Sequence, residues 1–526
     1  MDYFYALTFI IMRHTRKIIY VLLGLFVLAL LSNWGLNIWI DKQLPQLIAE
    51  KNKTPYTIKY KKADVSIWNS NVKVSGITIT LKKNFTDTLT APKIYATIVS
   101  VEIQKFRIWS LLFGDKIRAR NIIIHKPVVL LYKKNKKAPK EDKVKKPFGK
   151  IVEVSKIQIQ QGRLRIINDS NNIPVLTTKN INIDVNDIVI TDATLKQKIP
   201  FLYKAYALRC DSLYYKINDF YHITSGKVKV THTDVKVTAF ALVPEYTRPE
   251  FVQRIKKETD LFMLKSDSIR LKHMNWGFKN DRLFFEAQAI EIDQMFANIY
   301  RNKIPKDDLS KKHLYNKLLR DLSFRLKVDT LKIRNSLLKY EEEINFRKGP
   351  GILTFNKFHL TATNIRSGFG VKKLPDLKIL VNCRFMNTSP MKVNWKLNVM
   401  DPSDGFVISG SIFNFNTQRI DRFTKPHVNA KTHGVLDKVY FNFIGNDKVS
   451  KGNFALQYRD FKVAIYQKKD RQKKDVVLSF LGNLLVKNDS DQTVKEVTVA
   501  VDRIPEKSFY NLLWRSIAEG LKKILI

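Results

Sequence analysis

The chain has 526 residues, of which 44% are hydrophobic, and its 92 Lys and Arg against 48 Asp and Glu give a formal net charge of +44. This length allows several compact domains or one long repetitive one, and the few Gly and Pro residues exclude collagen-like and low-complexity chains. Two cysteines, Cys210 and Cys383, exclude a disulfide framework and a cysteine-based zinc cluster, although whether the two pair stays open. The positive charge favours contact with phosphate, in nucleic acid or in anionic lipid.

The N-terminal region predicts a membrane anchor over residues 17–40. Residues 18–40 carry no ionisable side chain, and a helix of this length covers a hydrocarbon core of about 30 Å. The residues expected to contact the bilayer or its interface are Ile18, Leu22, Leu25, Leu28, Trp34 and Trp39. The alternative is a cleaved signal peptide, which would need a shorter apolar region followed by small residues, whereas bulky residues follow here.

The orientation of this anchor follows from the basic residues that precede it, Arg13, Arg16 and Lys17. The positive-inside rule places residues 1–16 in the cytoplasm and the rest of the chain across the membrane. Either Met1 or Met12 is a plausible start, and the prediction depends on neither.

Strand patterns dominate after a predicted short helix over residues 41–54. One ten-residue frame recurs: two apolar residues at alternate positions, two turn-like or variable residues, and then two apolar residues in the opposite phase. Its copies begin at Val65, Ile122, Ile157, Leu213, Ile269 and Leu331. Alternation interrupted in this way predicts either a hairpin or a kinked strand with one apolar face.

The expected fold is mainly β: a curled, elongated, repetitive antiparallel sheet with few helices. Residues 55–132 would form an N-terminal β module and 151–503 a longer repetitive region, with roughly 25 strands in all. Residues 133–150, rich in lysine, predict a mobile basic loop between them. Helical insertions are expected near 249–262 and 310–324.

The last segment, 504–526, predicts an amphipathic helix. Its apolar residues are Phe509, Leu512, Leu513, Ile517, Leu521, Ile524 and Leu525. Such a helix could lie on a membrane surface, for instance the outer membrane or an envelope partner. It could equally cap the open end of the sheet, and the sequence does not separate the two.

A chain with so many strands that are apolar on one face can fold in two ways. The sheet closes on a dry core, or it curls into an open groove whose apolar lining needs a ligand such as a lipid acyl chain. For the groove, the candidate lipid-facing residues are Val65, Ile67, Ile122, Ile124, Ile157, Ile159, Ile269, Leu271, Leu331 and Ile333.

The stretch from Lys93, KIYATIVSVEIQKFRIWSLLFGDKIRARNIIIHKPVVLLYKK, resembles the N-terminal module of the AsmA-like family. The matching positions are Trp109, Ser110, Leu111, Leu112, Gly114, Ile122, Ile124 and Pro127. Residues 452–466, GNFALQYRDFKVAIY, resemble the family's closing strands. The resemblance implies a single-pass protein of the bacterial inner membrane with most of its chain in the periplasm. It also implies a groove-forming sheet that binds phospholipid or another envelope lipid and supports the outer membrane.

Motifs for catalysis are absent: there is no nucleophile elbow, phosphate loop or HExxH sequence, so neither an enzyme nor a cofactor or metal site is predicted. His427 and His433 are expected to be exposed in a turn, and 401–405 and 488–491 to be Asx turns. Lysines alternate with apolar residues, as in KVKVTHTDVKV (227–237), which predicts solvated strand faces and not nucleic-acid binding. Two functions remain: a lipid conduit between membranes, or a closed scaffold that assists outer-membrane protein biogenesis.

Overall fold

The computed structural model describes residues 55–66, 68–82, 93–107, 116–133, 151–465 and 489–525. The predicted cytoplasmic tail, membrane anchor, short helix and basic loop after Lys133 lie outside these residues. The described chain is mainly β, with 63% of residues in strands and 11% in helices, which confirms the predicted class. It divides into two compact units, Met1–Asp211 and Ser212–Ile526.

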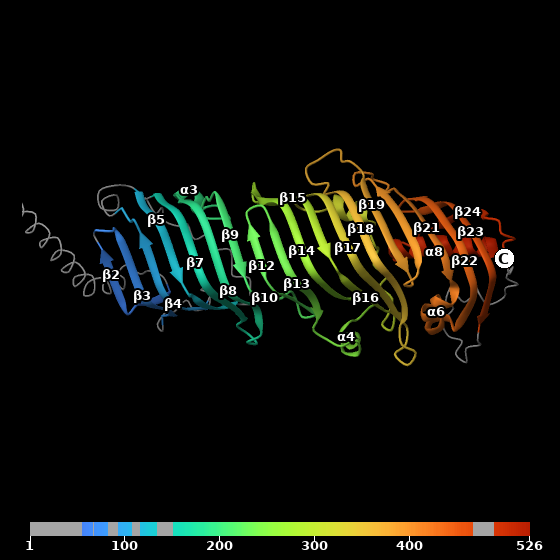
Figure 1. Ribbon diagram of the computed structural model, residues 1–526, viewed down its shortest axis with the longest axis horizontal. Helices are drawn as coiled ribbons and strands as arrows, with labels where there is room; N and C mark the ends of the chain where they lie inside the picture. Colours follow the sequence, from blue (N-terminus) through green and yellow to red (C-terminus); the bar gives the residue numbers. More distant parts are fainter. Residues whose placement is uncertain are drawn as a thin grey trace, which may run out of the picture. The chain divides into compact units, whose positions relative to one another are not determined.

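The described part of the first unit is a sheet with one short helix, α3 (Asp192–Leu195) (Figure 1). Its strands are β1 (Tyr56–Lys59), β2 (Lys62–Ser66), β3 (Asn71–Leu81), β4 (Lys93–Gln104), β5 (Lys116–His125), β6 (Val128–Lys133), β7 (Ile151–Asn168), β8 (Pro174–Ile190) and β9 (Ala205–Cys210).

The second unit continues the same architecture with longer strands. Its strands are β10 (Ser212–Lys216), β11 (Tyr221–Ser225), β12 (Val228–Thr231), β13 (Val235–Pro244), β14 (Asp260–Lys279), β15 (Arg282–Asp293), β16 (Phe296–Asn302), β17 (Arg325–Glu343), β18 (Gly351–Arg366), β19 (Leu377–Phe385), β20 (Ser389–Leu397), β21 (Phe406–Asn416), β22 (Ala430–Gly445), β23 (Val449–Ile465) and β24 (Lys495–Asp502). Its helices are α4 (Arg248–Arg254), α5 (Tyr315–Arg320), η1 (Thr417–Ile420), α6 (Asp421–Val428) and α8 (Phe509–Leu525). Helix α4 overlaps the first predicted insertion and begins one residue before it, whereas α5 lies within the second, and both are shorter than the predicted segments.

One arrangement of strands occurs in both units. In the first unit, the consecutive strands β5 and β6 both pair antiparallel with β4 on one side. On their other side both pair in parallel with the single long strand β7. In the second, β15 and β16 pair with β14 and then, in parallel, with β17. The predicted antiparallel pairing is therefore wrong at these two places, where the strands run parallel. A parallel pair needs a long return connection, and in the second unit this return contains α5.

The recurring frame marks bends in the sheet. In four of the predicted copies the fifth residue has a left-handed backbone, with φ between 46° and 55°: Lys126, Gln161, His273 and Asn335. A bulge of this kind adds one residue and bends the strand, so we infer that apolar residues before and after the bend share a face. The copies at Val65 and Leu213 instead span the hairpins β2–β3 and β10–β11. Both predicted forms of the frame are thus present.

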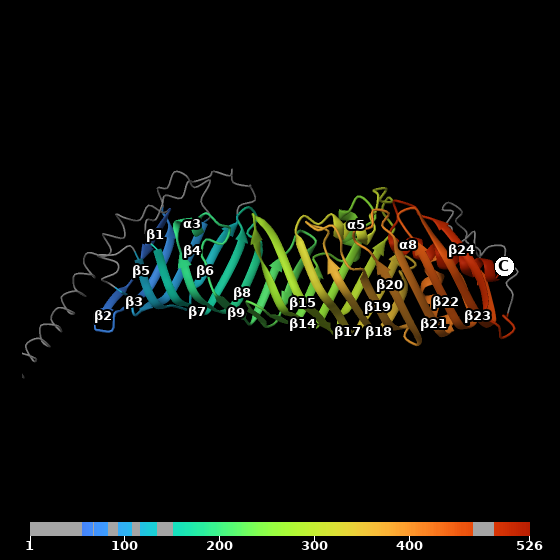
Figure 2. The same ribbon diagram turned by 90° about the horizontal axis from the view of Figure 1, so that it is seen from above.

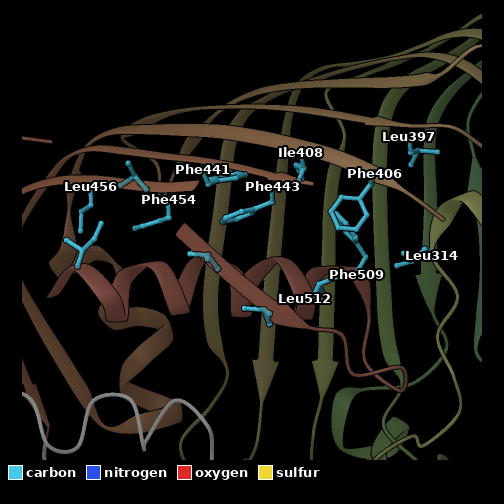
Figure 3. Close-up of a cluster of buried hydrophobic side chains, with 14 of the residues drawn as sticks. Leu314, Leu397, Phe406, Ile408, Phe441, Phe443, Phe454, Leu456, Phe509 and Leu512 are labelled. Carbon is cyan, nitrogen blue, oxygen red and sulfur yellow. The ribbon is translucent and has the colours of Figure 1, made fainter. Parts of the chain in front are cut away.

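The main hydrophobic core lies in the second unit, where the strands curve over α8 (Figure 3). Phe509 of α8 meets Phe406 edge-on with ring centroids 5.0 Å apart, and Leu512, Phe443 and Phe454 belong to the same core (Figure 3). Helix α8 lies against β23 and β24 (Figure 2). The apolar side of the C-terminal helix is therefore buried in the core, which agrees with the capping alternative. No helix in the described ranges is long and apolar enough to cross a membrane.

Two smaller expectations have clear outcomes. The cysteines do not pair: Cys210 and Cys383 are both buried free thiols, and burial raises the pKa of the Cys383 thiol to about 12. The prediction that His427 is exposed in a turn is wrong, because it lies in α6 and is 7% exposed. The expected Asx turns are present, since Asp401 accepts from the Ser403 amide at 2.9 Å and Asp489 accepts from the Asp491 amide at 2.7 Å.

Candidate functional site

Two apolar rows cross seven strands of the first unit, β2, β3, β4, β5, β7, β8 and β9, and they are the basis of the candidate site. Residues directly opposite one another in a sheet share a face. The first row is Val65, Val72, Ile103, Ile122, Ile157, Val185 and Tyr206. The second row is Ala63, Val74, Val101, Ile124, Ile159, Ile183 and Leu208. The sequence frame therefore places its apolar positions in register across the sheet.

The opposite face of the same strands is polar. Between the two rows lie Lys73 and Glu102, which form an ion pair at 2.8 Å, and Gln158, whose side-chain amide donates to Asp184 at 2.7 Å. Lys156 also pairs with Asp184 at 3.0 Å. This part of the sheet therefore has one apolar side and one solvated, ion-paired side.

The apolar rows of the first unit are poorly covered. The large side chains in them, such as Ile122, Ile124, Ile157 and Ile159, are only partly buried. The buried hydrophobic residues of this unit are mostly small or lie away from the rows, and its one described helix has four residues. Within the described residues of this unit, the apolar face thus lacks a layer to pack against.

The same two rows recur in the second unit over eleven strands, from β13 to β24 without β16. One row is Val237, Ile269, Ile292, Ile333, Leu360, Val381, Val393, Gly410, Phe441, Phe454 and Val497. The other is Val235, Leu271, Ile290, Leu331, Ala362, Ile379, Trp395, Ile408, Phe443, Gly452 and Val499. No charged residue occupies any of the four rows.

Coverage changes along these rows. Towards β24 they are closed under α8, and Phe443, Phe454 and Val499 are fully buried. Towards β13 the residues Ile269 and Leu271 are partly buried and lie outside the main core. The second unit therefore combines a closed core at one end with an open apolar face at the other.

On the polar side of the second unit, charges pair across strands. Glu291 is the centre of one such network: Arg270, Lys272 and Arg334 approach its carboxylate at 3.3, 3.1 and 3.1 Å. The hydrogen bond from Lys272, opposed by burial, is the largest contribution that lowers the pKa of Glu291. Part of the large positive charge of the chain is thus used in cross-strand ion pairs.

A buried ionic cluster joins α6 to the end of β17. His427 donates from Nδ1 to the Phe423 carbonyl at 2.7 Å, and its Nε2 lies 3.2 Å from Glu342. Glu342 also accepts from Tyr340 at 2.7 Å and pairs with Lys303 at 2.8 Å. Burial opposes ionisation of Glu342, but these partners together lower its pKa to about 2. With the Phe423 carbonyl at one ring nitrogen and the Glu342 carboxylate at the other, His427 ties α6 to the end of β17, and the cluster acts as a clamp on α6.

The predicted site residues can now be placed. Val65, Ile122, Ile157, Ile269 and Ile333 each lie in the first of the two rows of their unit, and Ile124, Ile159, Leu271 and Leu331 in the second. Ile67 lies outside the described residues, as do all six anchor residues and the residues 109–114 that carry part of the family resemblance.

One copy of the frame was missed in the sequence. It begins at Ile290 and reads I-E-I-D-Q-M-F-A-N-I, and its Ile290 and Ile292 pair in parallel with Leu331 and Ile333. Ile122 and Ile124 pair with Ile157 and Ile159 in the same way. This copy is hard to recognise because its eighth position is the small residue Ala297, but its apolar residues alternate on both sides of Gln294 as in the other copies.

Comparison with known proteins gives no further guide: no family model matches this chain, and no curated protein matches it.

Proposed function

We propose that this protein binds lipid acyl chains on its apolar sheet face and supports phospholipid transfer to, or homeostasis of, the outer membrane. The resemblance to the AsmA-like family supplies the cellular setting of this proposal: an anchor at residues 17–40 in the inner membrane, with the N-terminus cytoplasmic and the bulk of the chain periplasmic. The observation that carries it is the pair of uncharged, partly exposed apolar rows in the first unit.

The size of these rows suits an acyl chain. Seven strands about 4.8 Å apart make a row about 29 Å long, close to the thickness of a hydrocarbon core, which contains two acyl chains end to end. Full burial of an Ile or Leu side chain is worth about 1.5–3 kcal/mol. The large side chains of the two rows are only partly buried, so an apolar ligand that covers them would recover the remainder of this free energy.

The ion-paired face opposite the rows supports a fixed orientation for such a ligand. Acyl chains would be excluded from the side that carries Lys73, Glu102 and Asp184, because displacing water from paired charges is costly. In this proposal the protein is not an enzyme and needs no cofactor, since the work is done by apolar contact.

The test uses the full chain in growing cells, with a photoreactive benzoylphenylalanine in place of Ile159. The matched control carries the same residue in place of Gln158, the adjacent position on the polar face. After irradiation, mass spectrometry is expected to find phospholipid attached at position 159 and little at 158. The proposal is wrong if the photoreactive residue is incorporated equally well at positions 158 and 159 but no lipid is attached at position 159. The same residue in place of Ile124 must also capture no lipid for this conclusion.

A second function is favoured by one observation, the closed core under α8. A scaffold for outer-membrane protein biogenesis needs such a dry core and no lipid. In the same experiment it predicts crosslinks to a partner protein from the polar face, and none to lipid from the apolar face.

A further inference from the structure

A cavity on the bend of the first unit has a composition that the apolar rows do not explain. Its volume is about 850 Å³, and strands β3, β4, β6, β7 and β8 contribute to its walls. Four cations line it: Lys61, Lys126, Arg163 and Lys179. Asp211 is the one carboxylate among the lining residues, and its Oδ2 accepts a hydrogen bond from Asn180 at 2.7 Å.

Among the described residues, the four cations have no counter-charge paired with them. None of them forms an ion pair with any carboxylate in the described part of the chain, whereas Lys73, Lys93, Lys116, Arg118 and Lys156 of the same unit all do. Like charges around one cavity raise the local potential and attract an anion. The cavity therefore has a net positive charge that no described side chain satisfies.

The backbone is shaped around these cations. Gly76 has φ of +66°, and a Cβ there would lie 2.6 Å from Cγ of Lys61, so the lysine stem rests directly on the glycine. Lys126, Gln161 and Asn180 are non-glycine residues with left-handed φ of 46°, 55° and 52°. Strain of this kind persists only where the surrounding structure holds it and often marks a functional position.

The cavity lies on the polar side of the bend, away from the proposed acyl-chain face. Thr78, Thr97, Val128 and Arg163 are directly opposite one another in the sheet, and they alternate with the row that contains Ala96 and Leu164. Thr78 and Thr97 add hydroxyl groups, while Val99 and Val128 are 58% and 45% exposed at the wall. Cations, hydroxyls and two exposed apolar side chains together match a phosphate group that carries an organic substituent.

We propose that this cavity binds a phosphate group, with Lys61, Lys126, Arg163 and Lys179 as its counter-charges. The phosphate comes either from a phospholipid head group at a membrane surface or from a small soluble phosphate. This site is separate from the acyl-chain face and goes beyond the function proposed above.

The test is calorimetric titration of the full chain held in phosphatidylcholine nanodiscs. The probes are inorganic phosphate, glycerophosphoglycerol, and dihexanoyl phosphatidylglycerol below its micelle concentration. The triple variant Lys61→Ala, Lys126→Ala, Arg163→Ala is expected to lose at least tenfold in affinity. The control, Lys105→Ala, Lys133→Ala, Lys196→Ala, removes the same charge from exposed positions outside the cavity and is expected to bind as the unaltered chain does.

The outcomes separate the sources. Tighter binding of the phosphatidylglycerol than of the two soluble probes, with the excess lost in the cavity triple variant, assigns the site to a lipid head group, and equal binding of all three assigns it to soluble phosphate. Equal loss in both triple variants would show non-specific attraction and overturn the site, as would no binding of any probe. Because the readout does not involve position 159, the failure of one proposal leaves the other standing.

Discussion

Phe509 of α8 stacks on Trp395 of β20, with ring centroids 4.4 Å apart and 5° between the ring planes. Tyr315 of α5 meets both rings edge-on, at 5.3 Å from Trp395 and 6.3 Å from Phe509. Trp395 belongs to one of the apolar rows. The chain's own C-terminal helix therefore occupies the surface that an apolar ligand would otherwise contact at this end of the second unit.

Removing this stacked ring tests the role of α8. Phe509→Ala is expected to lower the unfolding free energy of the second unit by about 3 kcal/mol, because it deletes a buried aromatic side chain. Hydrogen exchange of the full chain, followed in peptides from β23 and β24, measures this loss of stability next to the helix. Trp514→Ala is the control, since Trp514 is 43% exposed, and it should change stability by less than about 0.5 kcal/mol. If Phe509→Ala weakens binding to lipid vesicles and leaves the hydrogen exchange of β23 and β24 unchanged, the result favours a helix that lies on a membrane surface.

Gly520 gives a test in which two effects have opposite signs. Alanine is a better helix former than glycine by about 1 kcal/mol, so Gly520→Ala would stabilise an undocked α8. In the structure a Cβ at this position lies 2.3 Å from Cγ of Phe454, so the helix must shift away from β23. The expected result is faster hydrogen exchange in α8 and β23. Slower exchange would mean that the helix is not packed there.

The sequence frame predicted which residues lie on the apolar face of the sheet, but it did not predict how the strands pair. The period-two alternation correctly placed residues such as Ile157 and Ile333 on an apolar face, because alternation follows directly from strand geometry. It did not reveal that Ile122 pairs with Ile157 in parallel, because strand direction depends on the return connection and leaves no local pattern. Nor could it show that α8 caps the sheet, since the same amphipathic pattern suits a membrane surface.

The burial of His427 was missed for a related reason. A histidine is read as exposed when no apolar neighbours surround it, and its partner Glu342 is far away in sequence. Buried charges that pair over long distances in the chain carry no local signal. The ionic clamp on α6 is therefore visible only in the structure.

The contrast between open and closed parts of the rows can be measured with matched truncations. Phe443 is fully buried, whereas Ile157 is only partly buried. Phe443→Ala should cost about 3–5 kcal/mol through the cavity it leaves. Ile157→Ala should cost about 1 kcal/mol, since a partly exposed side chain has less burial to lose. Urea titrations followed by hydrogen exchange in each unit check both values. An equally large loss for Ile157→Ala would show that the first unit has a closed core.

The clamp on α6 predicts how stability depends on pH. Glu342 has an unperturbed pKa of 4.5, and its partners lower the pKa to about 2 in the folded protein. A depressed carboxyl pKa contributes stability that is present above pH 4.5 and is lost as the pH falls towards 2. A difference of this size corresponds to roughly 3 kcal/mol.

Replacing the carboxylate isolates this contribution from the other acids nearby. Glu342→Gln should be less stable than the unaltered chain at pH 7, because Lys303 loses its counter-charge and His427 loses the carboxylate beside its Nε2, and the difference should shrink between pH 4.5 and 2. The measurement is the urea midpoint of the second unit at a series of pH values, with the exposed Asp219→Asn as control. If the gap between Glu342→Gln and the unaltered chain stays constant over this range, the carboxylate does not carry the charge that holds α6. A gap that closes in the same range as Glu342 titrates ties the docking of α6 to that one ionised group.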